Sequence, residues 1–399
     1  MRGDLSGASW ITFGTLFGQA VVFFATPTLA SMYGPDAFGA AAIFLAVASV
    51  IAPLLTFRLE LLLPTAGDGE VRWINRRANV LVITGATIFS VLYYFVFSPG
   101  WVASVAFWFA ASSIAAGFIT TQLLVRLRGF KALGVGKTAN GVGQVGVQVP
   151  IGLNYPSFKG MEVGFAFGYV AAWAIQRFSL RAISSAATMT RSRKQAIFRA
   201  ALKLTIAGLV NGLSVWGILF ALTMFHSSND VGIFSVVQRL VVTPAGLLTA
   251  SLLPVVTGGI AVAVRSGSSP LLTIRRWLIW LAPAAVLVLL VLLLVPGGFL
   301  VAILGPEYSG ADEYLRALAP MIAAQMIAGP LGQALVAMGG TTAQLIWDIV
   351  RFGVLVLTAL VTGYLGADPV TMTAVMSAVY ALCYASFVCT AYCMARVRK

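Results

Sequence analysis

Three arginines lie inside long apolar runs of this chain: Arg58, Arg239 and Arg351. A charged side chain near the centre of a membrane-spanning helix costs about 2.5–3.5 kcal/mol on insertion scales. A helix that faced only lipid would not keep such a residue, so we expect each arginine to face a protein interior or a water-filled cavity. Arginine presents a planar fork of N–H donors that matches phosphate and carboxylate oxygens. The residues therefore indicate either anion binding or structural ion pairs.

The sequence places the three arginines at different depths of the bilayer. Arg58 stands shortly before Pro64, at the cytoplasmic end of its run, whereas Arg239 lies early in a run that starts outside. Arg351 is expected near the middle. If all three face one cavity, they form a ladder of cations across the membrane.

Two carboxylates in the same runs, Glu60 and Asp348, are candidate coupling groups or structural partners. Asp348 precedes Arg351 by three residues, which places both on one helix face, where they can form an ion pair. Glu60 is two residues from Arg58 and would point elsewhere on a helix, so we expect no pair between those two. The residues alone leave both interpretations of the arginines open.

Three amides follow each other at helical spacing: Asn140, Gln144 and Gln148. Their period places them on one helix face, and an amide in hydrocarbon is costly. A single buried amide usually joins two helices, whereas three on one face favour a wet lining. We therefore predict that this amide stripe lines a central cavity and contacts the substrate, with interhelical packing as the alternative.

The composition predicts an all-α polytopic membrane protein. Of the 399 residues, 59% are hydrophobic and 10% are charged, and the mean hydropathy is +0.94. Soluble domains do not have this balance. We predict about twelve transmembrane helices, near residues 9–31, 39–63, 78–96, 101–123, 138–153, 161–179, 204–226, 231–257, 277–298, 314–337, 342–363 and 370–395.

The basic residues predict the topology. The formal net charge is +14, but the basic residues gather in alternate loops and at both ends of the chain. Only Lys159 and Arg316 fall on the opposite side. By the positive-inside rule, both termini are cytoplasmic. The charge is therefore a topology signal with some attraction to anionic lipids of the bilayer, and we expect no nucleic acid partner.

Several small or polar residues recur at nearly constant offsets, which is the pattern of an internal duplication. The recurring pairs are Gly14 and Gly208, Gly39 and Gly232, Gln122 and Gln333, and Gly129 and Gly340. We predict two six-helix lobes, 1–190 and 204–399, related by a parallel repeat around a central cavity. The linker, 191–203, is basic and cytoplasmic, and its SRKQAIFRAALK portion is expected to form an amphipathic surface helix.

Four stretches of the chain carry a family resemblance: residues 231–254, the GPEYSGADEYL run from Gly305, the IAGPL run from Ile327 with Gly339, and the YGPDAFG turn followed by FRLELLLP. These stretches resemble oligosaccharide flippases of the O-antigen and polysaccharide transporter type. This family belongs to the multidrug/oligosaccharidyl-lipid/polysaccharide (MOP) exporter superfamily.

The resemblance implies a transporter without enzymatic activity. Such a protein moves polyprenyl-pyrophosphate-linked oligosaccharide from the inner to the outer leaflet of the bacterial cytoplasmic membrane, by alternating access. The implied substrate-binding residues are the three arginines and the amide stripe. Glu60 and Asp348 are the implied coupling or structural partners, with Na+ or H+ as the coupling ion.

Two other functions stay open. A multidrug or cation antiporter of the same fold would bind its cargo with carboxylates. Here the embedded arginines outnumber the embedded carboxylates by three to two, which favours an anionic cargo. A membrane polysaccharide polymerase would need catalytic residues, but the chain has one histidine and no nucleophile elbow, phosphate loop or metal-ligand spacing. We therefore expect no cofactor and no metal site.

Overall fold

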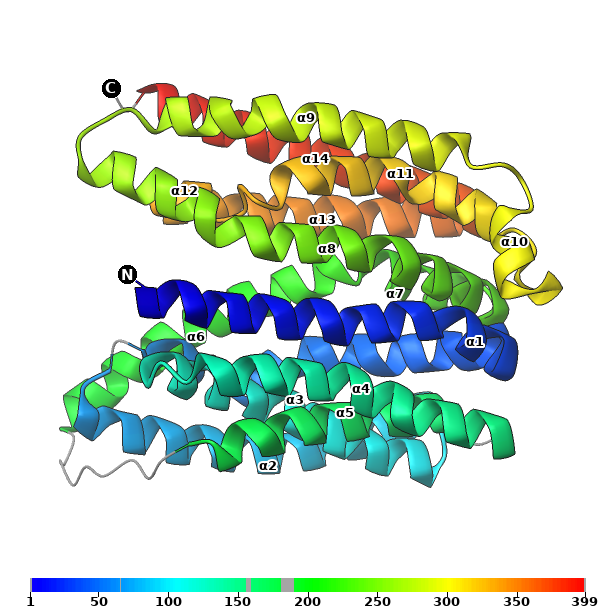
Figure 1. Cartoon of the computed structure of the whole chain (residues 1–399), viewed down its shortest axis with the longest axis horizontal. Coiled ribbons are helices and arrows are strands. Elements are labelled where there is room, and N and C mark those ends of the chain that lie inside the picture. The colour runs from blue at the N-terminus through cyan, green and yellow to red at the C-terminus, as the bar shows by residue number, and fades with distance from the viewer. Residues whose placement is uncertain (1, 65, 156–158, 181–189, 398–399) are drawn as a thin grey trace. The chain divides into compact units, whose positions relative to one another are not determined.

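The computed structural model describes residues 2–64, 66–155, 159–180 and 190–397, and in these ranges it contains helices and no strands (Figure 1). Eight helical segments among these residues are long and apolar enough to cross a membrane, and the first of them, Ser9–Leu55, contains the first predicted span and most of the second. The predicted spans 138–153, 161–179 and 314–337, outside those eight, coincide with shorter or glycine-rich helices. The predicted fold class, an all-α polytopic membrane protein, is confirmed.

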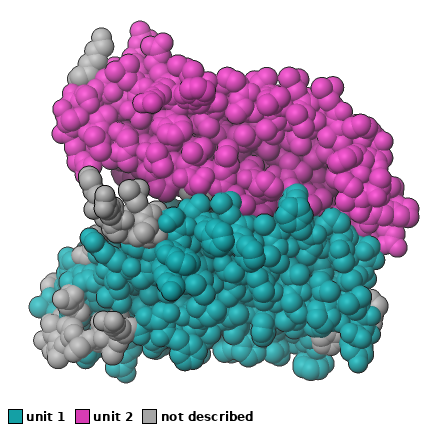
Figure 2. All heavy atoms as spheres, in the orientation of Figure 1, with its two compact units in different colours: residues 1–33, 40–213 teal, residues 34–39, 214–399 magenta. Residues whose placement is uncertain are grey.

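The chain forms two compact units, which are coloured separately in Figure 2. Unit 1 contains residues 1–33 and 40–213, and unit 2 contains residues 34–39 and 214–399. The predicted lobes were 1–190 and 204–399. The difference is that each unit includes a short piece of the other half of the chain.

Unit 1 is built from the first six helices. They are α1 (Arg2–Leu55), α2 (Asp68–Phe97), α3 (Trp101–Arg126), α4 (Phe130–Asn154), α5 (Gly160–Phe178) and α6 (Arg191–Val215). Helix α5 packs against both α3 and α4, and α2 packs against α3. The buried face of α3 consists largely of small residues (alanine, serine and threonine), so that neighbouring backbones can approach closely. Helix α1 is interrupted at Gly34, whose φ of 71° is not helical.

The predicted surface helix in the linker is not a separate element. Residues Arg191–Val215 form one continuous helix, α6, so the basic segment is the first half of the helix in which the seventh predicted span, 204–226, begins. Its Arg193 Nε lies 2.6 Å from Glu70 Oε1 of α2. This ion pair and the packing of Ile197 and Ala201, both buried, attach α6 to unit 1.

Unit 2 contains the remaining helices. They are α7 (Gly217–Phe225), α8 (Ser228–Arg265), α9 (Pro270–Leu294), α10 (Phe299–Leu304), α11 (Ala311–Ala328), α12 (Ala334–Ala337), α13 (Thr341–Tyr364) and α14 (Pro369–Val397). Helix α11 is the most buried of these and packs against α8, α9 and α14. A core cluster that includes Leu331, Leu335 and Phe387 joins α12 and α14 to α8 and α9.

The GPEYSGADEYL run forms the connection into α11. Gly305 and Gly310 have φ angles of 107° and 90°, which side-chain-bearing residues rarely adopt. Asp312, which is buried, accepts hydrogen bonds from the backbone N–H groups of Gly298 at 2.8 Å and Leu300 at 2.9 Å. The motif is therefore structural, because Asp312 caps the start of α10 from the neighbouring helix.

Two of the predicted repeats appear in the geometry. Gly129 and Gly340 precede α4 and α13 with nearly the same backbone angles, φ −78° and ψ 45° against φ −88° and ψ 46°. Each donates its N–H to the carbonyl five residues earlier, at 2.7 Å and 2.8 Å respectively. Gly39 and Gly232 contact each other within unit 2. By contrast, Gly14 packs against Gly134 of α4 and Gly208 packs against Arg58, so that recurrence does not reflect equivalent packing.

Candidate functional site

The predicted site residues form four groups, two in each unit. Arg58 and Glu60 follow the end of α1, and the amide stripe lies on α4. Arg239 lies in the first half of α8, and Asp348 and Arg351 lie on α13.

Arg58 does not lie inside a helix, contrary to the prediction of a span over residues 39–63. Helix α1 ends at Leu55, and a turn leads into the 3-10 helix η1 (Leu59–Leu62). Phe57 and Arg58 have φ angles of 52° and 50°, in the left-handed region. Because the helix has ended, Arg58 can turn back toward Glu60, and the atoms Nη1 and Oε1 are 3.6 Å apart. The expectation that these two residues would not pair was therefore wrong.

The next loop is held by another arginine, Arg126 at the end of α3. Its Nη1 donates to the carbonyl oxygens of Leu63, Pro64 and Ala66, at 3.1, 3.4 and 2.6 Å. The positive charge of the guanidinium also offsets the partial negative charge of these three carbonyl oxygens. Arg126 thus fixes the connection between η1 and α2, and with it the position of Glu60.

The amide stripe lies in the contact between α4 and α5. Gln144 and Gln148 are 5% and 0% exposed, and their side chains touch Gly168 and Gly164 of α5. Gln148 Nε2 donates to the Met161 carbonyl at 3.0 Å, and Gln144 Nε2 donates to Asn140 Oδ1 at 2.8 Å. In this structure the two glutamines join helices, which is the alternative considered above. A role of the stripe in substrate binding stays a prediction.

Arg239 lies on α8 near the segment that unit 2 takes from the first half of the chain. Its guanidinium carbon is 5.9 Å from the ring centroid of Phe38. The same segment is fixed to the start of α8, because Ser228 Oγ donates to Asp36 Oδ1 at 2.6 Å. Ser227 caps α8 in a capping box with Asp230. Phe38 of this segment thus lies beside the Arg239 guanidinium.

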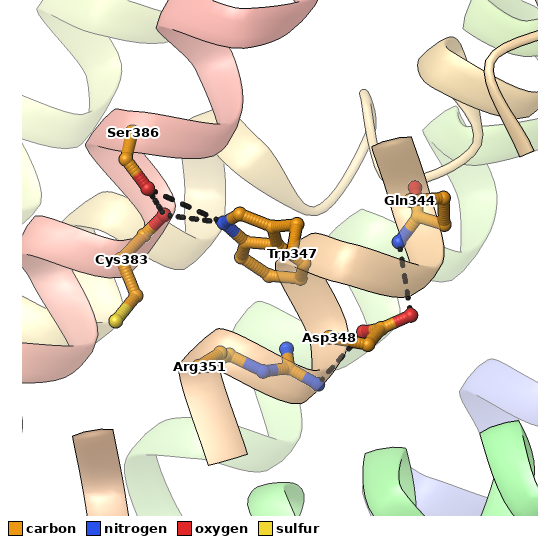
Figure 3. Close-up of polar contacts among 6 residues, drawn as sticks. All are labelled: Gln344, Trp347, Asp348, Arg351, Cys383 and Ser386. Atoms are coloured by element: carbon orange, nitrogen blue, oxygen red, sulfur yellow. Dashed lines mark hydrogen bonds and ion pairs between the residues drawn. The ribbon is translucent and has the colours of Figure 1, made fainter. Parts of the chain in front are cut away.

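The α13 group is the most completely connected, as Figure 3 shows. Asp348 accepts from Arg351 Nη2 at 3.2 Å through Oδ1, and from Gln344 Nε2 at 3.3 Å through Oδ2. The predicted i,i+3 ion pair is therefore present. The Asp348 and Arg351 side chains are 13% and 5% exposed.

Trp347 connects this group to α14. Its ring lies 4.4 Å from the Arg351 guanidinium carbon, and its Nε1 donates to the Cys383 carbonyl at 3.0 Å and to Ser386 Oγ at 3.3 Å (Figure 3). A stacked aromatic ring stabilises the cation in addition to the ion pair. Asp348 is thus a carboxylate that already pairs with the Arg351 cation. An external cation could bind to Asp348 only by displacing Arg351.

Sequence reasoning did not find Trp347 or Gly208. Trp347 precedes Arg351 by four residues on the same helix face, and that spacing was a usable signal. Gly208 was noticed only as part of a repeat. Its role in contacting Arg58 depends on where α1 ends, which the sequence does not indicate.

Solved structures of transporters have the same arrangement of helices. The lipid II flippase MurJ in an inward closed conformation matches with a TM-score of 0.73 and 13% identity, over 95% of this chain and 87% of that one. The chain has the fold of MOP-superfamily transporters. An outward-facing multidrug resistance MATE transporter of that superfamily matches with a TM-score of 0.60 and 13% identity, over 98% and 95% of the two chains.

The structure of a Vibrio cholerae MATE transporter also matches this chain, with a TM-score of 0.61 and 12% identity, over 100% of this chain and 99% of that one. No protein-family model and no curated protein matches the chain. The neighbours named here are transporters and not enzymes, and at these identities the likeness establishes the fold.

Proposed function

We propose that this protein is a flippase that moves a polyprenyl-pyrophosphate-linked oligosaccharide from the inner to the outer leaflet by alternating access. The observation that carries the proposal is the state of Arg58. Its side chain is 22% exposed, its Nε has no hydrogen-bond partner among the described residues, and its ion pair with Glu60 is loose. Such a guanidinium can bind a phosphate through two parallel charged hydrogen bonds.

Two further points support an anionic lipid as the cargo. The MOP-type fold includes a flippase for a lipid, since the MurJ structure is named for lipid II. Among the candidate site residues, Arg58, Arg239 and Arg351 outnumber the carboxylates Glu60 and Asp348, and both of these carboxylates already pair with arginines. The substrate therefore supplies negative charge rather than positive charge.

In the proposed cycle, Arg58, Arg351 and Arg239 bind the pyrophosphate in turn. Several moderate sites allow release more readily than one tight site. In a bacterial cytoplasmic membrane with both termini inside, a potential that is negative inside favours outward movement of an anion, by about 2.3 kcal/mol per charge per 100 mV. Amides on α4 would serve the glycan in a conformation that opens the α4–α5 contact.

A second candidate is a multidrug or cation antiporter, and the α13 group favours it. Asp348 is a nearly buried carboxylate on a spanning helix, and displacement of Arg351 would let it hold Na+, H+ or an organic cation. MATE transporters share the fold. The two candidates differ in the sign of the cargo, which an export assay separates.

The test is export of lipid-linked glycan in cells that carry Arg239→Ala, Arg239→Lys or Arg239→Glu at matched protein levels. We expect Ala and Glu to abolish export and Lys to retain part of it, because the charge contributes more than the fork. Arg265→Ala is the matched control, since Arg265 lies exposed at the other end of α8. Normal export by a stably folded Arg239→Ala protein would contradict the proposal.

A further inference from the structure

Glu60 is a buried carboxylate with little compensation for its charge. It is 1% exposed, and neither of its carboxylate oxygens accepts a hydrogen bond of good geometry among the described residues, although the Thr56 and Arg58 side chains lie near it. Keeping a buried carboxylate ionised without donors is costly. The Arg58 guanidinium at 3.6 Å is close enough to attract it but too far for a good hydrogen bond. The Arg58–Glu60 ion pair is therefore weak, and it breaks when Glu60 loses its charge or when Arg58 binds another anion.

Helix α6 holds Arg58 in this position. The Phe57 ring stacks on Phe198 of α6, with centroids 4.8 Å apart and planes 13° apart. The Arg58 guanidinium lies against Gly208, where an added Cβ would be 2.6 Å from Nε and 2.8 Å from Nη2. These contacts fix two consecutive residues in the left-handed region, which residues other than glycine seldom adopt. The arrangement is thus maintained by α6 and not by local preference.

Other charged groups around η1 are engaged elsewhere or point to solvent. On α3, Arg126 binds the carbonyls that follow η1. On α2, Glu70 pairs with Arg193 of α6, and Arg72, Arg76 and Arg77 are exposed. On α6, Arg199 and Lys203 are exposed. Among the described residues, Arg58 is therefore the charged group that faces the Glu60 carboxylate.

We propose that Glu60 competes with the cargo anion for Arg58, so that protonation of Glu60 releases Arg58 to bind a pyrophosphate. This inference rests on the proposed function, since it assigns a regulation to one of its arginines. When the carboxylate takes up one proton, its attraction for the guanidinium disappears, while Arg58 stays charged at every physiological pH. When the proton leaves, Glu60 pairs with Arg58 again and favours release of the anion.

Two measurable consequences follow. Anion binding is tighter at acid pH, and binding of each anion takes up a proton wherever Glu60 is ionised in the free protein. Gly208 is a positioning residue in this scheme, because a side chain there would move the guanidinium away from Glu60 without altering either charge.

The experiment uses the full chain in lipid nanodiscs and inorganic pyrophosphate as the probe, with calorimetric titration at about pH 5.5 and about pH 8. For each protein we take the ratio of its pyrophosphate affinity at the lower pH to its affinity at the higher pH. In Glu60→Gln this ratio reports only the titration of pyrophosphate itself. We expect the ratio for the wild type to be at least about tenfold larger than the ratio for Glu60→Gln. Glu60→Gln should bind at pH 8 at least as tightly as the wild type, and Arg58→Ala should lose most binding at both pH values. Glu162→Gln is the matched control, because Glu162 is also a buried carboxylate of unit 1 but pairs with Lys159 at the start of α5, and this variant should behave like the wild type.

A second pair of variants tests the geometry. Gly208→Ala places a methyl group against the Arg58 guanidinium, whereas Gly212→Ala, one turn further along α6, meets only Val50 at 3.6 Å or more. We expect Gly208→Ala to lose the wild-type pH difference and Gly212→Ala to keep it.

The outcomes separate the two proposals. Equal pH ratios in the wild type and Glu60→Gln, with binding still lost in Arg58→Ala, would overturn the competition and leave the flippase proposal standing. Retention of the full pH difference in Gly208→Ala would also overturn it. No pyrophosphate binding by any variant at either pH would overturn both.

Discussion

Removing the charge of Asp348 separates a structural ion pair from a coupling group. Asp348 and Arg351 are 13% and 5% exposed, so Asp348→Asn leaves a nearly buried guanidinium without its counter-ion. Breaking such a pair costs about 3–5 kcal/mol. The Trp347 ring at 4.4 Å retains part of the stabilisation of the cation, about 0.5–2 kcal/mol. We therefore expect Asp348→Asn to reduce the free energy of unfolding by about 2–3 kcal/mol.

The double variant Asp348→Leu with Arg351→Met removes both charges and fills similar volume. Replacing both partners of a buried pair by apolar residues is often neutral, so we expect the double variant to be within about 1 kcal/mol of the wild type. The assay is equilibrium unfolding in mixed detergent micelles for Asp348→Leu, for Arg351→Met and for the double variant. Glycan export is measured in parallel. A double variant whose loss equals the sum of the two single losses would refute the pairing argument. A stable double variant that does not export would assign the pair to coupling and not to structure.

Two further predictions concern helix caps in unit 2. Asp312→Ala removes the acceptor of two backbone N–H groups at the start of α10. We expect the free energy of unfolding to fall by about 2 kcal/mol in the same assay. Glu313→Ala, on the same turn, is the control and should change this free energy little. Asp368 accepts from the N–H groups of Val370 and Thr371 at the start of α14. Hydrogen bonding to the Thr371 side chain, together with these backbone hydrogen bonds, holds the pKa of Asp368 below its ordinary value. The cap therefore stabilises α14 above about pH 4 and is lost as the pH falls further. Asp368→Asn should remove this acid-dependent part of the thermal midpoint, and an unchanged acid slope would contradict the assignment.

The sequence predicted the helices because apolar runs of membrane length have few alternatives. The Asp348–Arg351 pair was equally readable, since both residues lie on one helix and the spacing fixes their proximity. The Arg58–Glu60 pair was not readable. FRLELLLP looks like uninterrupted helix up to Pro64, and nothing in the residue types signals that Phe57 and Arg58 turn left-handed. That turn depends on Phe198 and Gly208, which are distant in the sequence.

The amide stripe illustrates the same limit from another side. Its period showed correctly that Asn140, Gln144 and Gln148 share a face. The period carried no information about which helix covers that face, and the covering residues, Gly164 and Gly168, were not considered. Patterns within one helix were thus predictable, while contacts between helices were not.

The exchange of short pieces between the two units constrains the order in which the chain can be completed during synthesis. Asp36 cannot accept its hydrogen bond until Ser228, 192 residues later in the chain, has been synthesised. At an elongation rate of about 5–20 residues per second, that delay is roughly 10–40 s. Unit 1 likewise stays incomplete until α6, the first helix of the second half, has left the ribosome. Residues 34–39 therefore spend this interval without their partner, and this six-residue segment leaves less apolar surface uncovered during the wait than a complete apolar helix would.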